Sequence, residues 1–578
     1  MRKKLAALAG AVGATVVRPV ATDTWQATRS GVAWLLGRGE LGRPDETEAP
    51  RDHSIAAPVA TVSTRNWWTA PSRVLRGLGQ SVPAWQMCAG LLLLALVLRM
   101  MGLTADLPYI HHPDEPVNLR VIDAMVANGD ADPHFFNYPS LFLYLQAAFH
   151  LDGPLLGWIP GLAERAPVSP LMGISYAPTT GSVMVHRSLT VALGILVVLV
   201  GWITARRVTT GVLPAAVAAT LLALSPTLIT HSRFITPDMP TALLVAVAVL
   251  ASVRLLQSGS WLAYAASGLA VGLATSMKYT AVLVAVPVIV AALLRCTDRA
   301  GFRRAAAGLP IAGACAVLAF LATTPYALLD RAEFLRGLQF ERQHYATGHA
   351  GMDGDAVDFY AAYLATHEGL LIALVLVAVV AITMFDRQRW RVAVVIGSFP
   401  VIYSAVVAMQ AVRNDRTIML VLPPLAVFAG LAIEPLMTTL AQNHRAVGLG
   451  VAGTAVAVLA VGAVVRLPYP GPSTWNAAQH WLDEHTPSGT TVLIEPYAPW
   501  LNPARYKVIP CGRVVDCPPP RGGYVVASEG MYGRFTEEPK RYPDDAAAYQ
   551  RLFRHLSQVA IFDDPTSPVI RIFKVPAA

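Results

Sequence analysis

Long apolar runs dominate the chain from about residue 84 onward, and polar residues gather in short stretches between them. Each run is close to the length that crosses roughly 30 Å of hydrocarbon at about 1.5 Å per residue. The pattern therefore predicts a helical polytopic membrane protein with about eleven transmembrane helices. We place them near 84–103, 183–205, 211–230, 238–256, 261–277, 279–295, 305–324, 368–385, 391–409, 417–437 and 446–465.

The pattern predicts three domains. Residues 1–83 are Arg-rich and weakly patterned, which indicates a partly disordered cytoplasmic tail. The basic start "MRKKLAALAGAVGATVV" also imitates a signal peptide, but cleavage there would export seven arginines against the positive-inside bias. Residues 84–466 form the transmembrane domain, in which the apolar stretch 135–151 is short enough to be an interfacial helix.

Hydropathy falls after residue 466, and the pattern of 467–578 is that of a soluble α/β domain. "STWNAAQHWLDEHTPSG" has apolar spacing suited to a helix that ends at Pro and Gly. Five short segments rich in β-branched and aromatic residues predict strands. They are "TVLIEPY", "YKVIP", "GYVVAS", "QVAIFDD" and "PVIRIFKV".

Composition agrees with a membrane protein, because 54% of the 578 residues are hydrophobic and only 14% are charged. The net charge of +8 would suit a nucleic-acid-binding protein if the basic residues formed one patch. They instead fall in alternate loops between the spans, as expected of cytoplasmic loops in a plasma-membrane protein. These loops contain Arg206, Arg207, Arg254, Arg295, Arg299, Arg303, Arg304, Arg387, Arg389, Arg391 and Arg445 against Asp298 and Asp386.

The same topology places the acid-rich loops and the C-terminal domain outside the cytoplasm. Cys511 and Cys517 close a tight loop in that domain and can form a disulfide in an oxidising compartment. Their spacing fits no common zinc pair. With five cysteines in 578 residues, the chain is not a disulfide scaffold.

The outer loops bring acids and bases close to the span ends. The first loop reads "YIHHPDEPVNLR", the second "THSRFITPDMP", and "SMKYT" joins two short spans. A long loop carries "QFERQHYATGH", and "AVRNDRTIML" precedes another span. Charged residues beside prolines at one membrane depth indicate a rigid polar pocket. Such a pocket suits transfer from a lipid phosphate, because cations stabilise the leaving phosphate while a carboxylate takes a proton from the attacking hydroxyl.

This layout resembles the GT-C superfamily of polytopic glycosyltransferases, in particular bacterial members similar to protein O-mannosyltransferases and lipid A aminoarabinose transferases. The resemblance covers about residues 84–470, and "HPDEP" followed by "HFFNYPSLFLYLQA" is its most specific mark. It implies that Asp114 is the catalytic base and that Glu115 helps to bind or position the acceptor. It also implies phosphate contacts from Lys278, Arg413 and Arg416. Further candidates for substrate binding are His112, Asn137, Tyr138, His231, Arg233, Asp238, Tyr279 and His344.

The expected activity is inverting transfer of a mannose- or arabinose-like sugar from a polyprenyl-phosphate carrier to a hydroxyl of a glycan, glycolipid or protein on the outer face of the plasma membrane. Two alternatives stay open at this point: a secondary transporter and a polytopic envelope-assembly protein. Asp114 and Glu115 also suit a simple helix start over 116–127. Adjacent side chains diverge, so His111 and His112 make a poor metal pair. We assign no metal ligands, and assistance by a divalent cation stays open.

Overall fold

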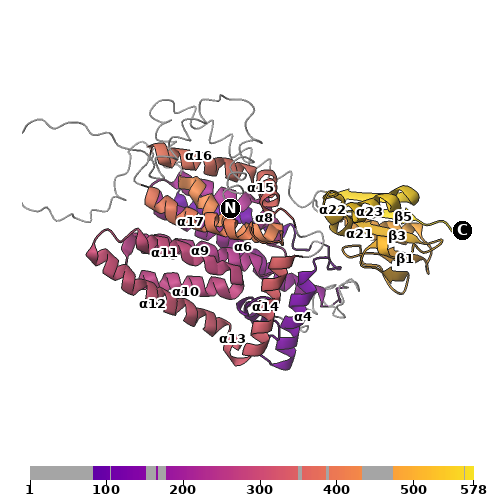
Figure 1. Cartoon of the computed structure of the whole chain (residues 1–578), viewed down its shortest axis with the longest axis horizontal. Helices are drawn as coiled ribbons and strands as arrows, with labels where there is room; N and C mark the ends of the chain where they lie inside the picture. Colours follow the sequence, from indigo (N-terminus) through magenta and orange to yellow (C-terminus); the bar gives the residue numbers. More distant parts are fainter. Residues whose placement is uncertain are drawn as a thin grey trace, which may run out of the picture. The chain divides into compact units, whose positions relative to one another are not determined.

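The structure is a computed structural model that describes residues 83–104, 106–150, 164–166, 178–348, 354–385, 389–431, 473–564 and 567–577. Two parts are treated below: the helical part, residues 83–431, and the C-terminal domain, residues 473–577 (Figure 1). The predicted tail up to residue 82 and the predicted span at 446–465 lie outside the described residues.

Helices make up the ordered elements of the helical part, and their order follows the predicted spans closely. They are α3 (Ala84–Met100), α4 (Asp114–Asn128), α5 (Leu141–Ala148), α6 (Thr180–Val208), α7 (Val212–Leu224), α8 (Pro226–His231), α9 (Asp238–Ser258), α10 (Trp261–Met277), η4 (Tyr279–Val284), α11 (Ala285–Leu293), α12 (Arg299–Thr323), α13 (Tyr326–Leu329), α14 (Arg331–Thr347), α15 (Ala356–His367), α16 (Gly369–Phe385), α17 (Trp390–Val407), α18 (Asp415–Ile418) and η5 (Met419–Val421).

Several helices are long and apolar enough to cross a membrane. Within the described ranges, four pass this test alone: α6, α9, α12 and α17. The pair α15 and α16 passes as one broken span, bent by 99°. Shorter apolar helices include α3, α7 and α10 together with the η4–α11 segment. The polytopic helical fold is therefore present, while the number of spans stays a prediction.

The predicted span at 211–230 is interrupted, because α7 ends at Leu224 and Pro226 begins α8. Proline removes a helical N–H donor and leaves carbonyl groups at the end of α7 without their usual partners. The buried Arg99 of α3 donates to two of these carbonyls, Leu222 O at 3.0 Å and Ala223 O at 3.2 Å. Arg99 also donates to the Ser232 hydroxyl at 3.1 Å. One side chain therefore binds both the end of α7 and the residue that follows α8.

Helices α10 and α12 lie side by side (Figure 1), and two glycines on α10 allow this approach. A Cβ atom at Gly268 would lie 2.0 Å from Ala312 O, and one at Gly272 would lie 2.2 Å from Ala316 O. Small residues four apart are the usual means by which membrane helices bring their backbones into contact.

The C-terminal domain is a five-stranded mixed sheet with helices on its two faces. All five predicted strands are present: β1 (Thr491–Ile494), β2 (Lys507–Pro510), β3 (Tyr524–Ser528), β4 (Ser557–Asp564) and β5 (Ser567–Lys574). The strand order is β2-β1-β3-β5-β4, parallel in the first three strands and antiparallel in the last three. The predicted helix is α21 (Thr474–His485); η6 (Val514–Asp516), α22 (Glu529–Thr536) and α23 (Pro543–His555) were not predicted.

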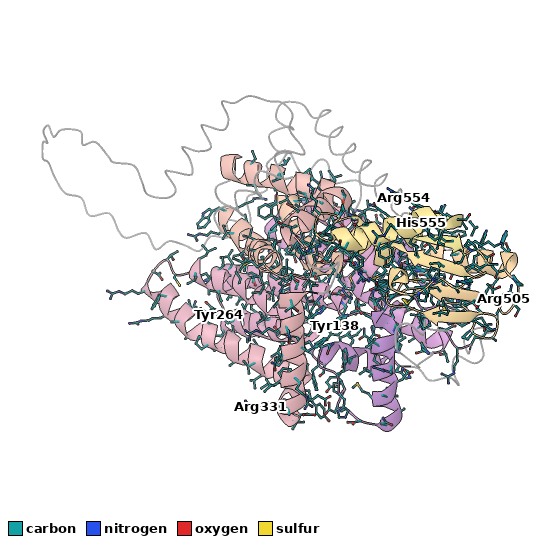
Figure 2. All side chains as sticks on the ribbon, turned by 45° about the vertical axis from the view of Figure 1, so that its right-hand side comes forward. Tyr138, Tyr264, Arg331, Arg505, Arg554 and His555 are labelled. Atoms are coloured by element: carbon teal, nitrogen blue, oxygen red, sulfur yellow. A yellow bond between two sulfur atoms is a disulfide. The ribbon has the colours of Figure 1, made fainter. Side chains whose placement is uncertain are left out.

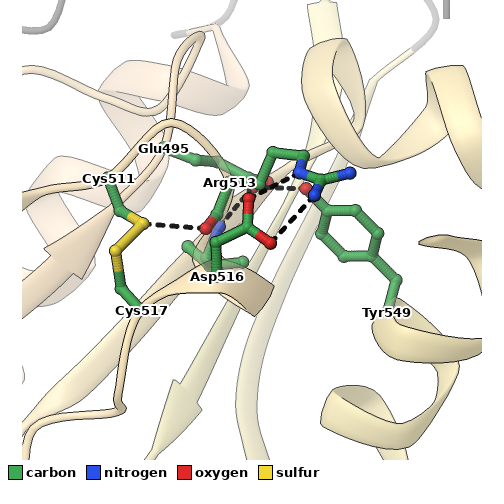
Figure 3. Close-up of a disulfide and its surroundings, with 7 residues drawn as sticks. Glu495, Cys511, Arg513, Asp516, Cys517 and Tyr549 are labelled. Atoms are coloured by element: carbon green, nitrogen blue, oxygen red, sulfur yellow. Dashed lines mark hydrogen bonds and ion pairs between the residues drawn. A yellow bond between two sulfur atoms is a disulfide. The ribbon is translucent and has the colours of Figure 1, made fainter. Parts of the chain in front are cut away.

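Glu495, the residue after β1, lies fully buried in this domain and joins three segments (Figure 3). Its carboxylate accepts hydrogen bonds from Val514 N at 3.0 Å, Ser528 N at 2.9 Å and the Tyr549 hydroxyl at 2.8 Å. Burial raises the pKa of Glu495 to about 7, although all three donors favour the charged form. Cys511 and Cys517, joined by a disulfide, hold the neighbouring loop.

We predict that Glu495→Ala destabilises the C-terminal domain, because it leaves three buried donors without an acceptor, at about 1–3 kcal/mol each. Hydrogen exchange of the full chain in detergent, followed by mass spectrometry, should show faster exchange in peptides that contain β1 and β3. Glu484→Ala, at an exposed position of α21, is the control. Equal exchange in the two variants would contradict the role given to Glu495.

Candidate active site

Three carboxylates in the helical part each begin a helix. Asp114 is the first residue of α4, Asp238 of α9 and Asp415 of α18. Proline precedes the first two, and Asn414 caps the third by accepting from Thr417 N at 3.0 Å. Free backbone N–H groups and the helix dipole favour negative charge at this position. The local sequence thus fixes where each carboxylate stands.

Each carboxylate also has a cationic or titratable partner from another segment. Arg416 Nη1 contacts Asp114 Oδ2, and these residues are 302 positions apart in the chain. Lys278 Nζ donates to Asp238 Oδ1 at 2.6 Å. His231 Nε2 lies 3.2 Å from Asp415 Oδ2. These six side chains form the charged site.

The pairs of the charged site influence one another. Arg416 interacts electrostatically with Asp238 and Asp415 as well as with Asp114. Burial acts to raise the pKa of Asp114, but Arg416 and then His112 outweigh burial and lower it. Burial likewise opposes ionisation of Asp415, while His231 and Arg416 lower its pKa. Both carboxylates are therefore ionised at neutral pH.

Exposure distinguishes the two acids that carry cationic partners. The Asp114 side chain is 23% exposed and that of Arg416 is 28% exposed. In contrast, Asp238 is 2% exposed and Lys278 8%. A solute can therefore reach Asp114 and Arg416 directly, whereas Asp238 and Lys278 lie beneath the surface.

Glu115 is held inside the protein, away from solvent. Arg187 of α6 grips both carboxylate oxygens, with Nε 2.8 Å from Oε1 and Nη2 2.7 Å from Oε2. Ile235 N, just before α9, donates to Glu115 Oε1 at 3.2 Å. Of the two roles open for Glu115, these contacts support the structural one, because the pair holds the start of α4 against α6 and the segment that leads into α9.

Other predicted site residues lie around the charged site. His112 accepts from Asp114 N at 3.2 Å and packs its ring 4.4 Å from that of Phe234. Tyr138, labelled in Figure 2, has Asp114, Arg416, Asp238 and Lys278 as electrostatic neighbours. Neighbouring Asn137 is half-buried and makes no hydrogen bond within the described part of the chain.

Four further predicted residues are placed differently. Arg233 is buried with its guanidinium 5.4 Å from the centre of the Phe234 ring. The Tyr279 hydroxyl donates to Phe136 O at 3.0 Å, which is a structural contact. His344 of α14 stacks on Phe340 and has Arg416 as a charged neighbour. Arg413 lies over the ring of Phe359 at 5.5 Å rather than in one of the ion pairs of the charged site.

The sequence pattern missed Arg187 and Glu341. Arg187 lies inside a predicted apolar span, and an ionisable residue there by itself indicates a buried partner. Glu341 stands in the "QFERQHYATGH" stretch, but its place beside the charged site depends on how α14 is oriented. No spacing rule in the sequence gives that orientation.

One group among the described residues has metal-ligand chemistry: Asp132, His134 and Asp330, with ligand atoms within 4.8 Å of one another. The His134 ring already contacts Glu333 Oε2 at 3.2 Å and Asp130 Oδ2 at 3.3 Å. None of these residues belongs to the charged site, so the group gives no support to metal assistance of chemistry there.

Comparison with known proteins bears directly on this site. Residues 172–327 match the family model described as dolichyl-phosphate-mannose-protein mannosyltransferase. The predicted likeness to GT-C glycosyltransferases is confirmed. The matched segment contains His231, Asp238 and Lys278 of the charged site, and also Arg187. The comparison with curated proteins gave no matching sequence.

The chain is also similar to several solved structures. ArnT from Cupriavidus metallidurans bound to undecaprenyl phosphate is 16% identical with a TM-score of 0.47, over 84% of this chain and 97% of that one. The Archaeoglobus fulgidus oligosaccharyltransferase tethered with an acceptor peptide is 14% identical with a TM-score of 0.47, over 84% and 74%. The S. cerevisiae Pmt1-Pmt2 complex bound to the sugar donor is 19% identical with a TM-score of 0.31, over 50% and 38%.

We predict that Glu115→Ala lowers the free energy of unfolding by about 3–5 kcal/mol, because it leaves the buried Arg187 charge unpaired. The double variant Glu115→Ala with Arg187→Leu should recover most of this loss, since it removes the charge. Thermal midpoints in detergent measure both effects. If the double variant is no more stable than the single one, the unpaired charge is not the cause.

Proposed function

We propose that the chain is a membrane glycosyltransferase that uses a polyprenyl-phosphate sugar donor. The observation that carries the proposal is the convergence of Asp114, Asp238, Lys278 and Arg416 from separate segments on one site. This site pairs carboxylates that can accept a proton with cations that can hold a phosphate. The family match over residues 172–327 supports the same chemistry.

The donor phosphate binds near Lys278 and Arg416, which are the two permanent cations of the charged site. Both already neutralise a carboxylate, so phosphate has to compete for them. Arg416 is the more accessible of the two, and its planar guanidinium can bind phosphate through two N–H groups at once. When Arg416 turns to the phosphate, Asp114 loses its partner and its carboxylate becomes available.

Asp114 then acts as the base. The acceptor oxygen attacks the anomeric carbon of the sugar from the face opposite the phosphate, while its proton passes to the Asp114 carboxylate. The bond between the anomeric carbon and the phosphate oxygen breaks, and its electron pair leaves with the phosphate. Configuration at the anomeric carbon is inverted. Asp114 is preferred to Asp238 as base because it is the more exposed carboxylate.

A mannose- or arabinose-like sugar and a hydroxyl of a glycan, glycolipid or protein fit the proposal. The charged site and the C-terminal domain face the exterior of the plasma membrane in the topology that the arginine distribution predicts. The disulfide in the C-terminal domain supports this orientation, because disulfides persist in oxidising compartments.

The first test is chemical and applies to any transferred sugar. Loss of one positioned base lowers rates by about 10²–10⁴, so a deletion strain complemented with Asp114→Asn should accumulate the lipid-linked sugar donor and lack one envelope glycan. Mass spectrometry of lipids and glycans measures both.

The control for this test is Asp358→Asn, the same substitution at an exposed position of α15, which should restore the wild-type pattern. The Asp114→Asn protein should keep its thermal midpoint and its abundance. If that strain makes the glycan normally, Asp114 is not the base.

A second test compares the contributions of Arg416 and Arg413 to phosphate binding. Arg416→Ala should weaken binding of polyprenyl phosphate by about tenfold or more, the loss of roughly 1.4 kcal/mol or more of charge-assisted hydrogen bonding. Arg413→Ala should weaken it less, because Arg413 stacks on Phe359. Calorimetric titration in detergent measures both dissociation constants. A larger effect at Arg413 would move the phosphate away from the charged site.

A further inference from the structure

Helix α14 lies against the segment that carries Phe136 and against the turn between α10 and η4. The Phe334 ring meets the rings of Phe136 at 5.7 Å and Tyr279 at 6.1 Å. One turn further, a Cβ atom at Gly337 would lie 2.7 Å from Phe136 Cβ. Since Phe334 and Gly337 pack against the same segment, they define the inner face of α14; Arg331, labelled in Figure 2, marks the start of this helix.

Glu341 lies on the same face, four residues after Gly337 and seven after Phe334. The charged and titratable groups that act on it come from three other segments. Lys278 precedes η4, Arg416 belongs to α18 and Asp114 begins α4. Tyr279 of η4 also has Glu341 as its electrostatic neighbour. The inner face of α14 therefore brings a fourth carboxyl group to the charged site.

Glu341 differs from the other three carboxyl groups in its partners. Asp114, Asp238 and Asp415 each have a cation or histidine within ion-pair distance. Within the described residues, the Glu341 side chain forms neither an ion pair nor a hydrogen bond. This side chain is only half-buried, so it is accessible to a ligand. Burial raises the pKa of Glu341 to about 7, and the attraction of Lys278 and Arg416 offsets burial only in part.

We propose that Glu341, in its protonated form, donates a hydrogen bond to the phosphate of the lipid-linked donor. This inference rests on the proposed function and adds a specificity residue to the same site. A neutral carboxyl group can share a site with an anion, whereas the ionised form repels the phosphate and competes with it for Lys278 and Arg416. Loss of the Glu341 proton therefore releases the donor.

The test measures the dissociation constant of a polyprenyl methyl phosphodiester for the full chain in detergent between pH 6 and pH 8. This probe keeps one negative charge over the whole range, so only the protein titrates. A carboxyl group with a pKa of about 7 goes from about nine-tenths to one-tenth protonated over this interval, so we expect the dissociation constant to rise about tenfold.

Glu341→Gln keeps a neutral hydrogen-bond donor at every pH. It should bind the probe about as tightly as the wild type at pH 6, and its dissociation constant should stay flat up to pH 8. Glu341→Asp keeps a titratable group and should retain a pH dependence. Glu164→Gln, the same substitution at an exposed position, should behave like the wild type and serves as the matched control.

The outcomes distinguish this inference from the proposed function. If Glu341→Gln binds the probe with the same pH dependence as the wild type, another group causes that dependence, and the role of Glu341 is overturned while donor binding stands. If no variant binds the probe at any pH, both the inference and the proposed function fail. Because the thermal midpoint of each variant is measured alongside, loss of folding is recognised separately.

Discussion

Pairing of charge between distant segments is the constraint on which the helical part depends. Isolated buried charges cost several kcal/mol, so each one needs a partner. Here Glu115 meets Arg187, Asp238 meets Lys278 and Asp114 meets Arg416. The carboxylates begin helices and the cations come from other segments, so each pair fixes one helix end relative to another. Glu115 directly follows Asp114 in sequence, and its pair with Arg187 is the most deeply buried of the three, with side-chain exposures of 0% and 2%.

Under the proposed function, the same constraint gives the site two states. Without donor, Arg416 and Lys278 each pair with a carboxylate. With donor, the phosphate can replace the carboxylate as their partner. Burying an unpaired cation costs desolvation free energy. A protein whose cations pair with carboxylates until the anionic substrate binds avoids most of this cost. In the proposed mechanism this exchange also controls the base, because Asp114 gains basicity when Arg416 moves to the phosphate. Fixed helix starts hold the carboxylates in place during the exchange.

Much of this arrangement could be predicted from sequence, and the exceptions have a physical cause. Apolar run length predicted most of the long helices, and segments rich in β-branched and aromatic residues predicted all five strands. Charge at the span ends predicted a polar pocket, and the resemblance added Lys278 and Arg416 to Asp114 and Asp238 there. Pro226 interrupts a span that hydropathy read as continuous, because hydropathy does not register a missing N–H donor. Glu341 and Arg413 depend on helix orientation, which is set by contacts such as those of Phe334 and Phe359 with residues far along the chain. Local sequence patterns do not predict contacts between residues that are far apart in the chain.

The most direct test of the account is an experimental structure of the chain with a bound, unreactive polyprenyl-phosphate sugar. Partner exchange predicts that a phosphate oxygen lies within hydrogen-bond distance of the Arg416 guanidinium, that the contact between Arg416 and Asp114 is broken, and that an Asp114 oxygen faces the anomeric carbon on the side opposite the phosphate. A phosphate bound elsewhere, with the ion pair between Asp114 and Arg416 intact, would contradict it.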